Sequence, residues 1–502
     1  MTLTAAQKRI TLLAAIMGSF VALLDSTVVN VALPAIREDL GGGLAGQQWV
    51  VNAYLLMLGS LILIGGSLGD VYGAKRVFTL GVAGFGVASV VCAAAPSVEL
   101  LVAGRALQGG FGALLTPASL AIIVAVFSGH ERGAAIGAWT AYSGIASVVG
   151  PLAGGGLIDA LDWRWIFAIN VPFVALTLVL AARMPMLPVM TAGRHPDWVG
   201  AALCAAGLAG PTFGLIQQPE HGWGSPMVAL PIAAGLAIFA AFLAWERRQR
   251  DPMLPLSLFG RGNFAWGNVE TLALYGGLGA TFFLLVLFLQ QVGNLGAFEA
   301  GLATLPATVA MFAFSRRFGA LADRYGPRLF MGLGPLVCAA GVLLLLAMVD
   351  ETPAFVAEVL PGLVVFSVGL SIVVAPLTAA ILADAEEQNA GIASGVNNAV
   401  ARVASLLATA AIGAVIGGTL DLDGFRMGLT FAAILMGIGG LVGLLRIKNP
   451  RRPVSAEDCP GGQLAGQPKP AWCPEEEERS PGSDRTPIAA GARSPSRGSP
   501  AA

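Results

Sequence analysis

Long apolar segments recur along most of this 502-residue chain. Most reach 18 residues or more, enough for a helix to cross a hydrocarbon core of about 30 Å. Charged residues make up only 12% of the sequence, against about 25% in soluble domains. Segments this long and apolar are typical of membrane-spanning helices, which satisfy their own backbone hydrogen bonds. The sequence therefore predicts an all-α integral membrane protein that crosses the bilayer many times.

Fourteen segments qualify as transmembrane spans. The first follows MTLTAAQKRI without a convincing cleavage site, so we expect it to be kept as a span rather than removed as a signal. Two segments in the middle of the chain are weaker than the rest, and Gly210-Pro211 interrupts one of them. The predicted spans are residues 10–33, 47–69, 77–96, 98–126, 133–158, 162–182, 198–218, 226–245, 264–289, 299–319, 329–349, 354–383, 389–417 and 424–446.

Basic residues fix the expected sidedness of these spans. With the N-terminus in the cytoplasm, 24 of the 29 Lys and Arg residues fall in cytoplasmic segments, including the clusters at Lys75, Arg247 and Arg316. An odd number of spans would place successive clusters on opposite sides of the membrane. The positive-inside rule therefore predicts that both termini are cytoplasmic in a multi-pass protein of the plasma or inner membrane.

The C-terminal segment differs in composition from the rest. Residues 450–502 contain ten prolines, and residues 475–478 form an acidic run. Such a segment cannot bury enough apolar area to fold. We expect a disordered cytoplasmic tail over 447–502, either dispensable for activity or serving as a partner-binding or phosphorylated segment.

A short sequence recurs in both parts of the chain. GSLGDVYGAKR at 66–76 aligns with GALADRYGPRL at 319–329, and each copy lies at the cytoplasmic end of one span and precedes another. Two copies with the same sidedness indicate two halves related by parallel duplication, as in transporters that rock two halves around a midplane site. We expect these turns to gate that movement. Their candidate residues are Gly66, Asp70, Gly73, Lys75, Arg76, Gly319, Asp323, Arg324, Gly326 and Arg328.

The repeat divides the fourteen spans into six, two and six. The expected organisation is a cytoplasmic N-terminus at 1–9, an N-terminal six-helix half at 10–182, a linker with two extra helices at 183–263, a C-terminal six-helix half at 264–446, and the tail at 447–502.

Five motifs resemble those of the major facilitator superfamily, and within it the fourteen-span drug:proton antiporter family. They are LDSTVVNVALP (24–34), the turn at 66–76, GRALQGGFGA (104–113), ASVVGPLAGG (146–155) and WRWIFAINVP (163–172), in the family's order. The resemblance covers about residues 8–448. It implies the major facilitator fold and proton-coupled export of amphipathic or lipophilic small molecules, such as drugs and antibiotics, by alternating access. An importer or facilitator of a specific metabolite is the alternative on the same fold.

The motif at 146–155 combines a proline with small residues. Pro151 removes a backbone donor, while Gly150, Gly154 and Gly155 allow neighbouring helices to approach closely. Packing alone explains this combination as well as a bend used in alternating access. The resemblance favours the antiporter interpretation.

Four charged residues lie inside predicted spans, where a charge normally faces the bundle interior or an aqueous cavity and has a partner. We predict that Asp25, Arg105, Glu270 and Arg402 take part in proton coupling. Asp25 is the expected proton-exchanging carboxylate, and Arg105 is one possible partner for it, although the sequence does not show which of these charges pair. Pairing within each half is one arrangement that we consider. Structural hydrogen bonding and snorkelling to the interface are the alternative interpretations.

Polar residues within the spans are candidates for lining a substrate cavity, although interhelical hydrogen bonding explains any one of them equally well. A mostly apolar cavity with few charges fits an amphipathic molecule better than a sugar or a phosphate. The candidates are Asn30, Asn52, Tyr54, Gln108, Gln290, Gln291, Asn397 and Asn398.

Other function classes find little support. There is no G-x-x-x-x-G-K-[ST] loop, so ATP is not expected as the energy source. The five cysteines have no metal-site spacing, and we expect no metal or cofactor beyond the proton as coupling ion. No reactive cluster favours a membrane enzyme, and nothing indicates a nucleic-acid partner. We expect a monomer in the bilayer; a non-transporting sensor acting through the tail is a further alternative.

Overall fold

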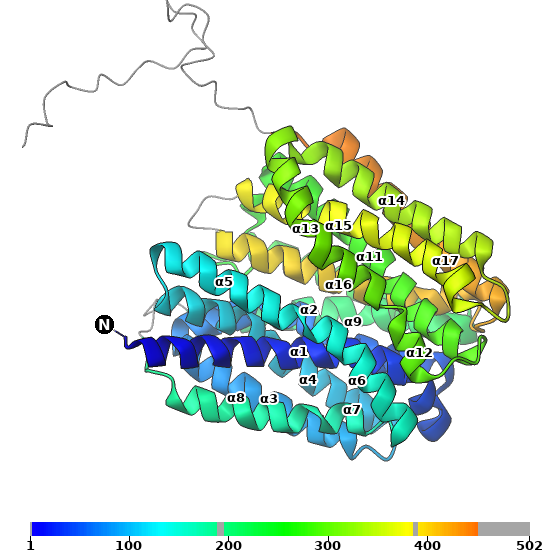
Figure 1. Ribbon diagram of the computed structural model, residues 1–502, viewed down its shortest axis with the longest axis horizontal. Coiled ribbons are helices and arrows are strands. Elements are labelled where there is room, and N and C mark those ends of the chain that lie inside the picture. Colours follow the sequence, from blue (N-terminus) through cyan, green and yellow to red (C-terminus); the bar gives the residue numbers. More distant parts are fainter. Residues whose placement is uncertain (1–2, 188–194, 385–389, 450–502) are drawn as a thin grey trace, which may run out of the picture. The chain divides into compact units, whose positions relative to one another are not determined.

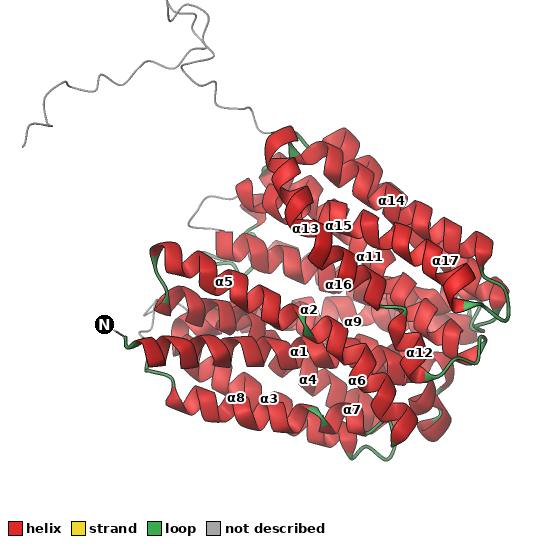
Figure 2. Cartoon of the chain, viewed as in Figure 1, coloured by secondary structure: helices red, strands yellow, loops and turns green. Residues whose placement is uncertain are grey.

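The fold was obtained as a computed structural model, which describes residues 3–187, 195–384 and 390–449. Within these ranges the chain is helical and contains no β-strand (Figure 2). Fourteen helical segments there are long and apolar enough to cross a membrane. They coincide in order with the fourteen predicted spans, which confirms the predicted fold class. The tail from residue 450 onward lies outside the described residues.

The N-terminal half packs its helices around α1 and α4 (Figure 1). Helix α1 starts at a capping box, in which the Thr4 side chain accepts a hydrogen bond from the backbone N–H of Gln7, and the Gln7 side chain accepts one from the backbone N–H of Thr4. Two of the predicted spans are interrupted: the fifth at Ile145 and the sixth at Ile169. The helices are α1 (Ala5–Leu40), α2 (Gly43–Tyr72), α3 (Ala74–Ala93), α4 (Val98–Val126), α5 (Gly129–Gly144), α6 (Ala146–Ala160), α7 (Trp165–Ala168) and α8 (Asn170–Arg183).

Two helices, α9 (Trp198–His221) and α10 (Pro226–Glu246), form the hairpin between the halves. Helix α9 contacts α10, α2 and α16, so it touches both halves of the bundle. The ring of Trp49 on α2 lies 6.1 Å from the ring of Phe213 on α9. The predicted insertion of two extra helices is therefore present and packs against both halves.

The C-terminal half repeats the pattern of the first. Its main bundle starts with α11, whose first backbone N–H groups, those of Asn263 and Phe264, donate to the carboxylate of Asp384 at 2.8 and 3.1 Å. The elements are η1 (Leu256–Gly260), α11 (Gly262–Gln291), α12 (Ala297–Leu302), α13 (Leu305–Tyr325), α14 (Pro327–Met348), η2 (Phe355–Val359), α15 (Leu360–Ala383), α16 (Ala390–Ile416) and α17 (Leu422–Arg446).

The two repeated turns have the same geometry. Gly73 ends α2 and precedes α3 with φ of 92°, and Gly326 ends α13 and precedes α14 with φ of 90°. Only glycine adopts this left-handed conformation readily, so both turns require it. The helix boundaries follow the sequence repeat residue for residue, which supports duplication of one half.

We call the end of the bundle that holds Ala5, Gly73 and Gly326 the N-terminal face, and the end that holds Leu40, Asp159 and Gly296 the distal face. In Figure 1 the N-terminal end of α1 is at the left, and α6 and α12 lie to the right of it. This naming uses the direction of the helices and implies no sidedness in a membrane.

Hydrogen bonds join the two halves near the distal face. Arg37 donates to Gln291 Oε1 at 2.7 Å, and Gln290 donates to the carbonyl of Val31 at 3.0 Å. The Asp159 carboxylate at the end of α6 accepts from the backbone N–H groups of Ala297 and Phe298, at 3.1 and 3.0 Å, and so caps α12 of the other half. We call this set of contacts the distal seal.

Candidate functional site

Asp25 lies in a buried hydrogen-bond network inside the N-terminal half. Arg105 Nη1 on α4 is 2.5 Å from Asp25 Oδ2 on α1, and the two side chains are 2% and 0% exposed. The same nitrogen donates to Gln108 Oε1 at 2.8 Å, while Gln108 Nε2 donates to Asp25 Oδ1 at 3.1 Å. Asp25 therefore pairs with Arg105, the possible partner that the sequence offered without deciding the pairing.

Two residues that the sequence reasoning did not single out complete this network. Asn170 Nδ2 at the start of α8 donates to Asp25 Oδ1 at 2.9 Å, and Ser89 Oγ on α3 accepts from Gln108 Nε2 at 2.8 Å. Asn170 belongs to the motif WRWIFAINVP, which carried the only available signal. Ser89 stands alone in an apolar span, where nothing distinguished it. Both Asp25 oxygens are thus bound by side chains from two other helices, α4 and α8, and Ser89 of α3 supports Gln108.

Arg105 is held on its remaining sides as well. Its Nε donates to the backbone carbonyl of Val50 at 3.1 Å, and its guanidinium carbon lies 4.3 Å from the centre of the Tyr54 ring. Charge on a planar guanidinium is well matched by a carboxylate and an aromatic face. The arginine therefore links α4 to α1 and α2 through its own side chain.

Two adjoining cavities lie between the halves next to this network. The smaller, about 230 Å³, is lined by Arg105 and Tyr54 of the first half and by Arg402, Ser405 and other residues of the second. Asp25 is not among its lining residues, whereas Arg105, which binds the carboxylate, is. Arg105 therefore connects the buried carboxylate to the cavity wall.

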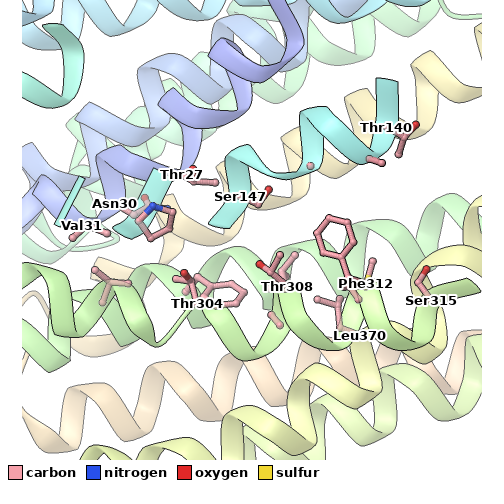
Figure 3. A pocket seen from close by; sticks show the side chains of 18 residues that line it. Thr27, Asn30, Val31, Thr140, Ser147, Thr304, Thr308, Phe312, Ser315 and Leu370 are labelled. Carbon is pink, nitrogen blue, oxygen red and sulfur yellow. The ribbon is translucent and has the colours of Figure 1, made fainter. Parts of the chain in front are cut away.

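The larger cavity, about 530 Å³, adjoins the smaller one at Asn30 and Phe282 and extends toward the N-terminal face. Side chains of α1 and of α5 and α6 face side chains of α13 across it (Figure 3). Its polar groups are uncharged and sit in an otherwise apolar lining. They are Thr27, Asn30, Thr140, Ser147, Thr304, Thr308 and Ser315.

Of the predicted cavity residues, Asn30 and Tyr54 line these cavities. The others have different surroundings. Gln108 belongs to the Asp25 network, and Gln290 and Gln291 belong to the distal seal. The expectation that they line the cavity is not met, because each is engaged by a neighbouring helix.

The three remaining asparagines are also accounted for. Asn52 is 0% exposed, and neither of its side-chain polar atoms has a hydrogen-bond partner among the described residues. Asn397 donates to Thr271 Oγ1 at 2.8 Å and joins α16 to α11. Asn398 is exposed and donates to Ser394 in its own helix. None of them lines either cavity.

Glu270 and Arg402 do not pair in the described part of the chain. Glu270 on α11 is 0% exposed, and both its oxygens lack a hydrogen-bond partner there. It lines neither cavity, and Gly267, one turn earlier, packs against Ile381. Arg402 lies in the smaller cavity. Pairing within each half therefore holds for the first half only.

The motif at 146–155 packs against both halves. A Cβ on Gly150 or Gly154 would collide with Thr27 or Val28 of α1. A Cβ on Gly155 would lie 2.7 Å from the carbonyl oxygen of Ala297 on α12. The motif thus brings α6 close to α1 on one side and to the distal seal on the other. Pro151 also contributes to the wall of the larger cavity.

The turn residues at the N-terminal face brace neighbouring helix ends. Lys75 donates to the carbonyl of Met184 at 2.5 Å, and Arg328 Nε donates to that of Leu444 at 2.6 Å. Cations at helix C-termini are favourable because free carbonyls carry partial negative charge there. The remaining charged candidates in these turns, Asp70, Arg76, Asp323 and Arg324, are exposed, and Gly66 and Gly319 lie one to two turns before the helix ends.

A comparison with family models decides the classification. The model described as the Major Facilitator Superfamily matches residues 15–409. The chain belongs to the major facilitator superfamily. Membership agrees with the resemblance found in the motifs, and it places the chain among membrane transporters rather than enzymes.

Named relatives refine this placement within the major facilitator superfamily. The chain is 37% identical over 79% of its length to a probable actinorhodin transporter of Streptomyces coelicolor, covering 70% of that protein. It is 33% identical over 84% of its length to a methylenomycin A resistance protein of Bacillus subtilis, covering 90% of it. Both are named for antibiotics.

Solved structures of membrane transporters share the fold. A POT family transporter bound to a thioalcohol-conjugated peptide aligns with a TM-score of 0.67 at 12% identity, covering 86% of this chain and 94% of that one. At this identity the comparison establishes the fold alone, and it confirms the predicted major facilitator architecture.

Proposed function

We propose that this protein exports amphipathic or lipophilic small molecules, of the kind represented by antibiotics, in exchange for protons. The observation that carries the proposal is the buried Asp25–Arg105 pair, whose arginine forms a wall of the cavity between the two halves. The relatives named for actinorhodin and methylenomycin A support antibiotic-like substrates. The cavity volume of about 530 Å³ falls within the range typical of drug-sized ligands.

Helix α1 provides a mechanical path from the proton site to the distal seal. Asp25 binds Arg105, and two residues further along α1 the segment Thr27–Val28 packs on the glycines of α6. Another turn along, the carbonyl of Val31 accepts from Gln290 of the second half. Protonation of Asp25 removes the charge that holds Arg105, so a change in how α1 packs on α4 is transmitted to the seal.

The orientation in the membrane is part of this proposal. The basic turns at the N-terminal face favour a cytoplasmic location for that face, in the plasma or inner membrane. The distal seal then closes the outer side, and the larger cavity extends toward the cytoplasm. Substrate enters from the cytoplasm or the inner leaflet, and the halves rock to expose the cavity outside.

The proton gradient supplies enough energy for this exchange. A proton entering down 100 mV gains about 2.3 kcal/mol. One pH unit adds about 1.4 kcal/mol. For a neutral substrate exchanged one for one, the sum sustains a gradient of about 500-fold.

Glu270 is the second proton-coupling residue in our proposal. An isolated buried carboxylate without hydrogen bonds is very costly in an apolar interior, so the neutral, protonated acid is the form this environment tolerates. A second proton raises the driving force for each substrate exported. Its position away from both cavities supports a role that does not depend on direct contact with substrate.

Inside-out membrane vesicles test the proposal. With an acidified lumen, vesicles carrying the protein should accumulate an amphipathic dye, and Asp25→Asn should abolish this uptake while the variant remains in the membrane. Vesicles from cells without the protein are the control for passive entry. Lack of gradient-driven uptake of any dye in a broad panel would overturn export. Unchanged uptake by Asp25→Asn would overturn the assignment of Asp25.

A further inference from the structure

The smaller cavity contains a positive charge that no acidic side chain compensates. Two charged residues line it, Arg105 and Arg402, and the larger cavity is lined by uncharged residues alone. Arg105 is neutralised by Asp25. Arg402 has no salt bridge or hydrogen bond to any residue in the described ranges. The pair of cavities therefore carries a net charge of about +1 when Asp25 is ionised.

The position of Arg402 is fixed by close packing of its helix. Gly59 of α2 faces its Cβ, and a Cβ on that glycine would lie only 3.3 Å from it. One turn further along α16, Ser405 Oγ donates to the carbonyl of Tyr275 at 3.2 Å and ties α16 to α11. The Cβ of Arg402 is thus packed between helices, and the residue lines the smaller cavity. This arrangement is built into the fold and does not arise from a loose surface side chain.

An uncompensated guanidinium in an apolar cavity favours an anion as its partner. Burying a charge is costly unless a counter-charge or hydrogen bonds replace the lost water. Glu270 is a buried acid in the same C-terminal half as Arg402. It does not supply that counter-charge, since its oxygens have no partner in the described structure. A bound cation would add a second positive charge to the same space.

We propose that the substrate is an amphipathic molecule bearing a negative group, such as a carboxylate or enolate, which binds Arg402. Its apolar body lies in the larger cavity along Phe282, Leu278 and Phe312. The hydroxyl groups of that cavity accommodate neutral polar substituents. This inference rests on the proposed export function and specifies the charge of what is exported.

Charge balance also fixes the sign of a pH effect. Asp25 binds Arg105 of α4 and Asn170 of α8. The titratable groups around this network are Tyr54 of α2, whose ring lies against Arg105, and Cys92 of α3, which donates to Gln108. When Asp25 is protonated, Arg105 joins Arg402 as an uncompensated cation, so anion binding tightens as the pH falls. By linkage, the anion also favours the proton. Coupled exchange then requires that the protein does not switch between its inward-open and outward-open states while it holds both the proton and the anion.

Matched pyrene probes test the charge preference. The full-length protein in lipid nanodiscs is titrated with 1-pyrenebutyrate, its neutral amide and 4-(1-pyrenyl)butylamine, and fluorescence reports binding. Loss of a charged hydrogen bond corresponds to about 10- to 100-fold in affinity. The wild-type protein should bind the acid at least about 10-fold more tightly than the amide, and more tightly at lower pH.

Four variants separate local charge from other effects. Arg402→Gln should equalise acid and amide binding, with amide binding retained as proof of an intact cavity. Arg402→Lys should keep much of the preference. Arg316→Gln, which removes an exposed arginine outside both cavities, should leave it unchanged. Asp25→Asn should abolish the pH dependence.

The outcomes distinguish this inference from the export proposal. Equal binding of acid and amide by the wild-type protein, or an acid preference that persists in Arg402→Gln, overturns the anionic substrate and leaves export intact. Failure of all three probes to bind contradicts the proposed amphipathic cavity itself.

Discussion

Asn170 and Asp25, 145 residues apart in sequence, meet in a hydrogen bond of 2.9 Å between the amide nitrogen and Oδ1 of the carboxylate. Arg105 holds the opposite oxygen. Asn170 lies at the first turn of α8, directly after the break at Ile169, and it therefore sets the position of the carboxylate from the side opposite the arginine.

Replacing Asn170 with Ala should lower the maximal rate of proton-driven dye transport by about 10-fold with little change in apparent KM, because a hydrogen bond to a charged group is worth about 1.5–3 kcal/mol. Initial rates in vesicles at a series of dye concentrations measure both parameters. Asn398→Ala is the matched control, since that asparagine is exposed and bonds within its own helix. Equal rates in the two variants would contradict the positioning role.

Removing one member of the Asp25–Arg105 pair should destabilise the protein more than removing both. An uncompensated buried charge costs about 3–5 kcal/mol, whereas replacing both charges is often close to neutral. Unfolding midpoints in detergent for Asp25→Asn, Arg105→Gln and the double variant give the coupling energy. Additive effects of the two substitutions would show that the pair is not energetically coupled.

Replacing Gly155 with Val should open the distal seal, because even a Cβ would collide with the backbone of α12 at Ala297 and Phe298. Labelling of an Asn30→Cys reporter by an impermeant thiol reagent applied at the distal face should become faster. Gly156→Ala is the control, because nothing lies within 4 Å of a Cβ at that position. Similar labelling in both variants would exclude this close contact as part of the seal.

Glu270→Gln should leave the fold stable, since the amide replaces an acid that has no partner to lose in the described structure. The infrared band of a protonated carboxylic acid should weaken in this variant, and fewer protons should be exchanged per dye molecule. Glu299→Gln, at the exposed start of α12, is the control. An unchanged proton-to-dye ratio would remove Glu270 from the coupling mechanism.

Export of an anion should depend more steeply on voltage than export of its neutral amide. One proton entering for one anion leaving moves two charges, so 100 mV and one pH unit together supply about 6 kcal/mol, or a gradient of about 10⁴-fold. Proteoliposomes with a potassium diffusion potential measure accumulation of 1-pyrenebutyrate and its amide. Equal voltage dependence for the two probes would argue against exchange of one proton for one anion.

The sequence by itself determined the number and order of the fourteen spans, the repeated turns at Gly73 and Gly326, and the presence of charged residues such as Asp25 and Arg105 inside spans. Each of these depends on local information: apolar length, a backbone angle that glycine adopts readily, and the cost of a charge inside a span. These features stand in the sequence regardless of how the helices are rotated.

The tertiary structure decided which faces of the helices meet. It brought Asn170 and Ser89 to the Asp25 network, assigned Gln290 and Gln291 to the distal seal, and left Glu270 apart from Arg402. An apolar span has polar residues on several faces, and hydropathy does not reveal which of them point at another helix. Their partners depend on helix rotation and crossing, which are set by packing among all the neighbouring helices.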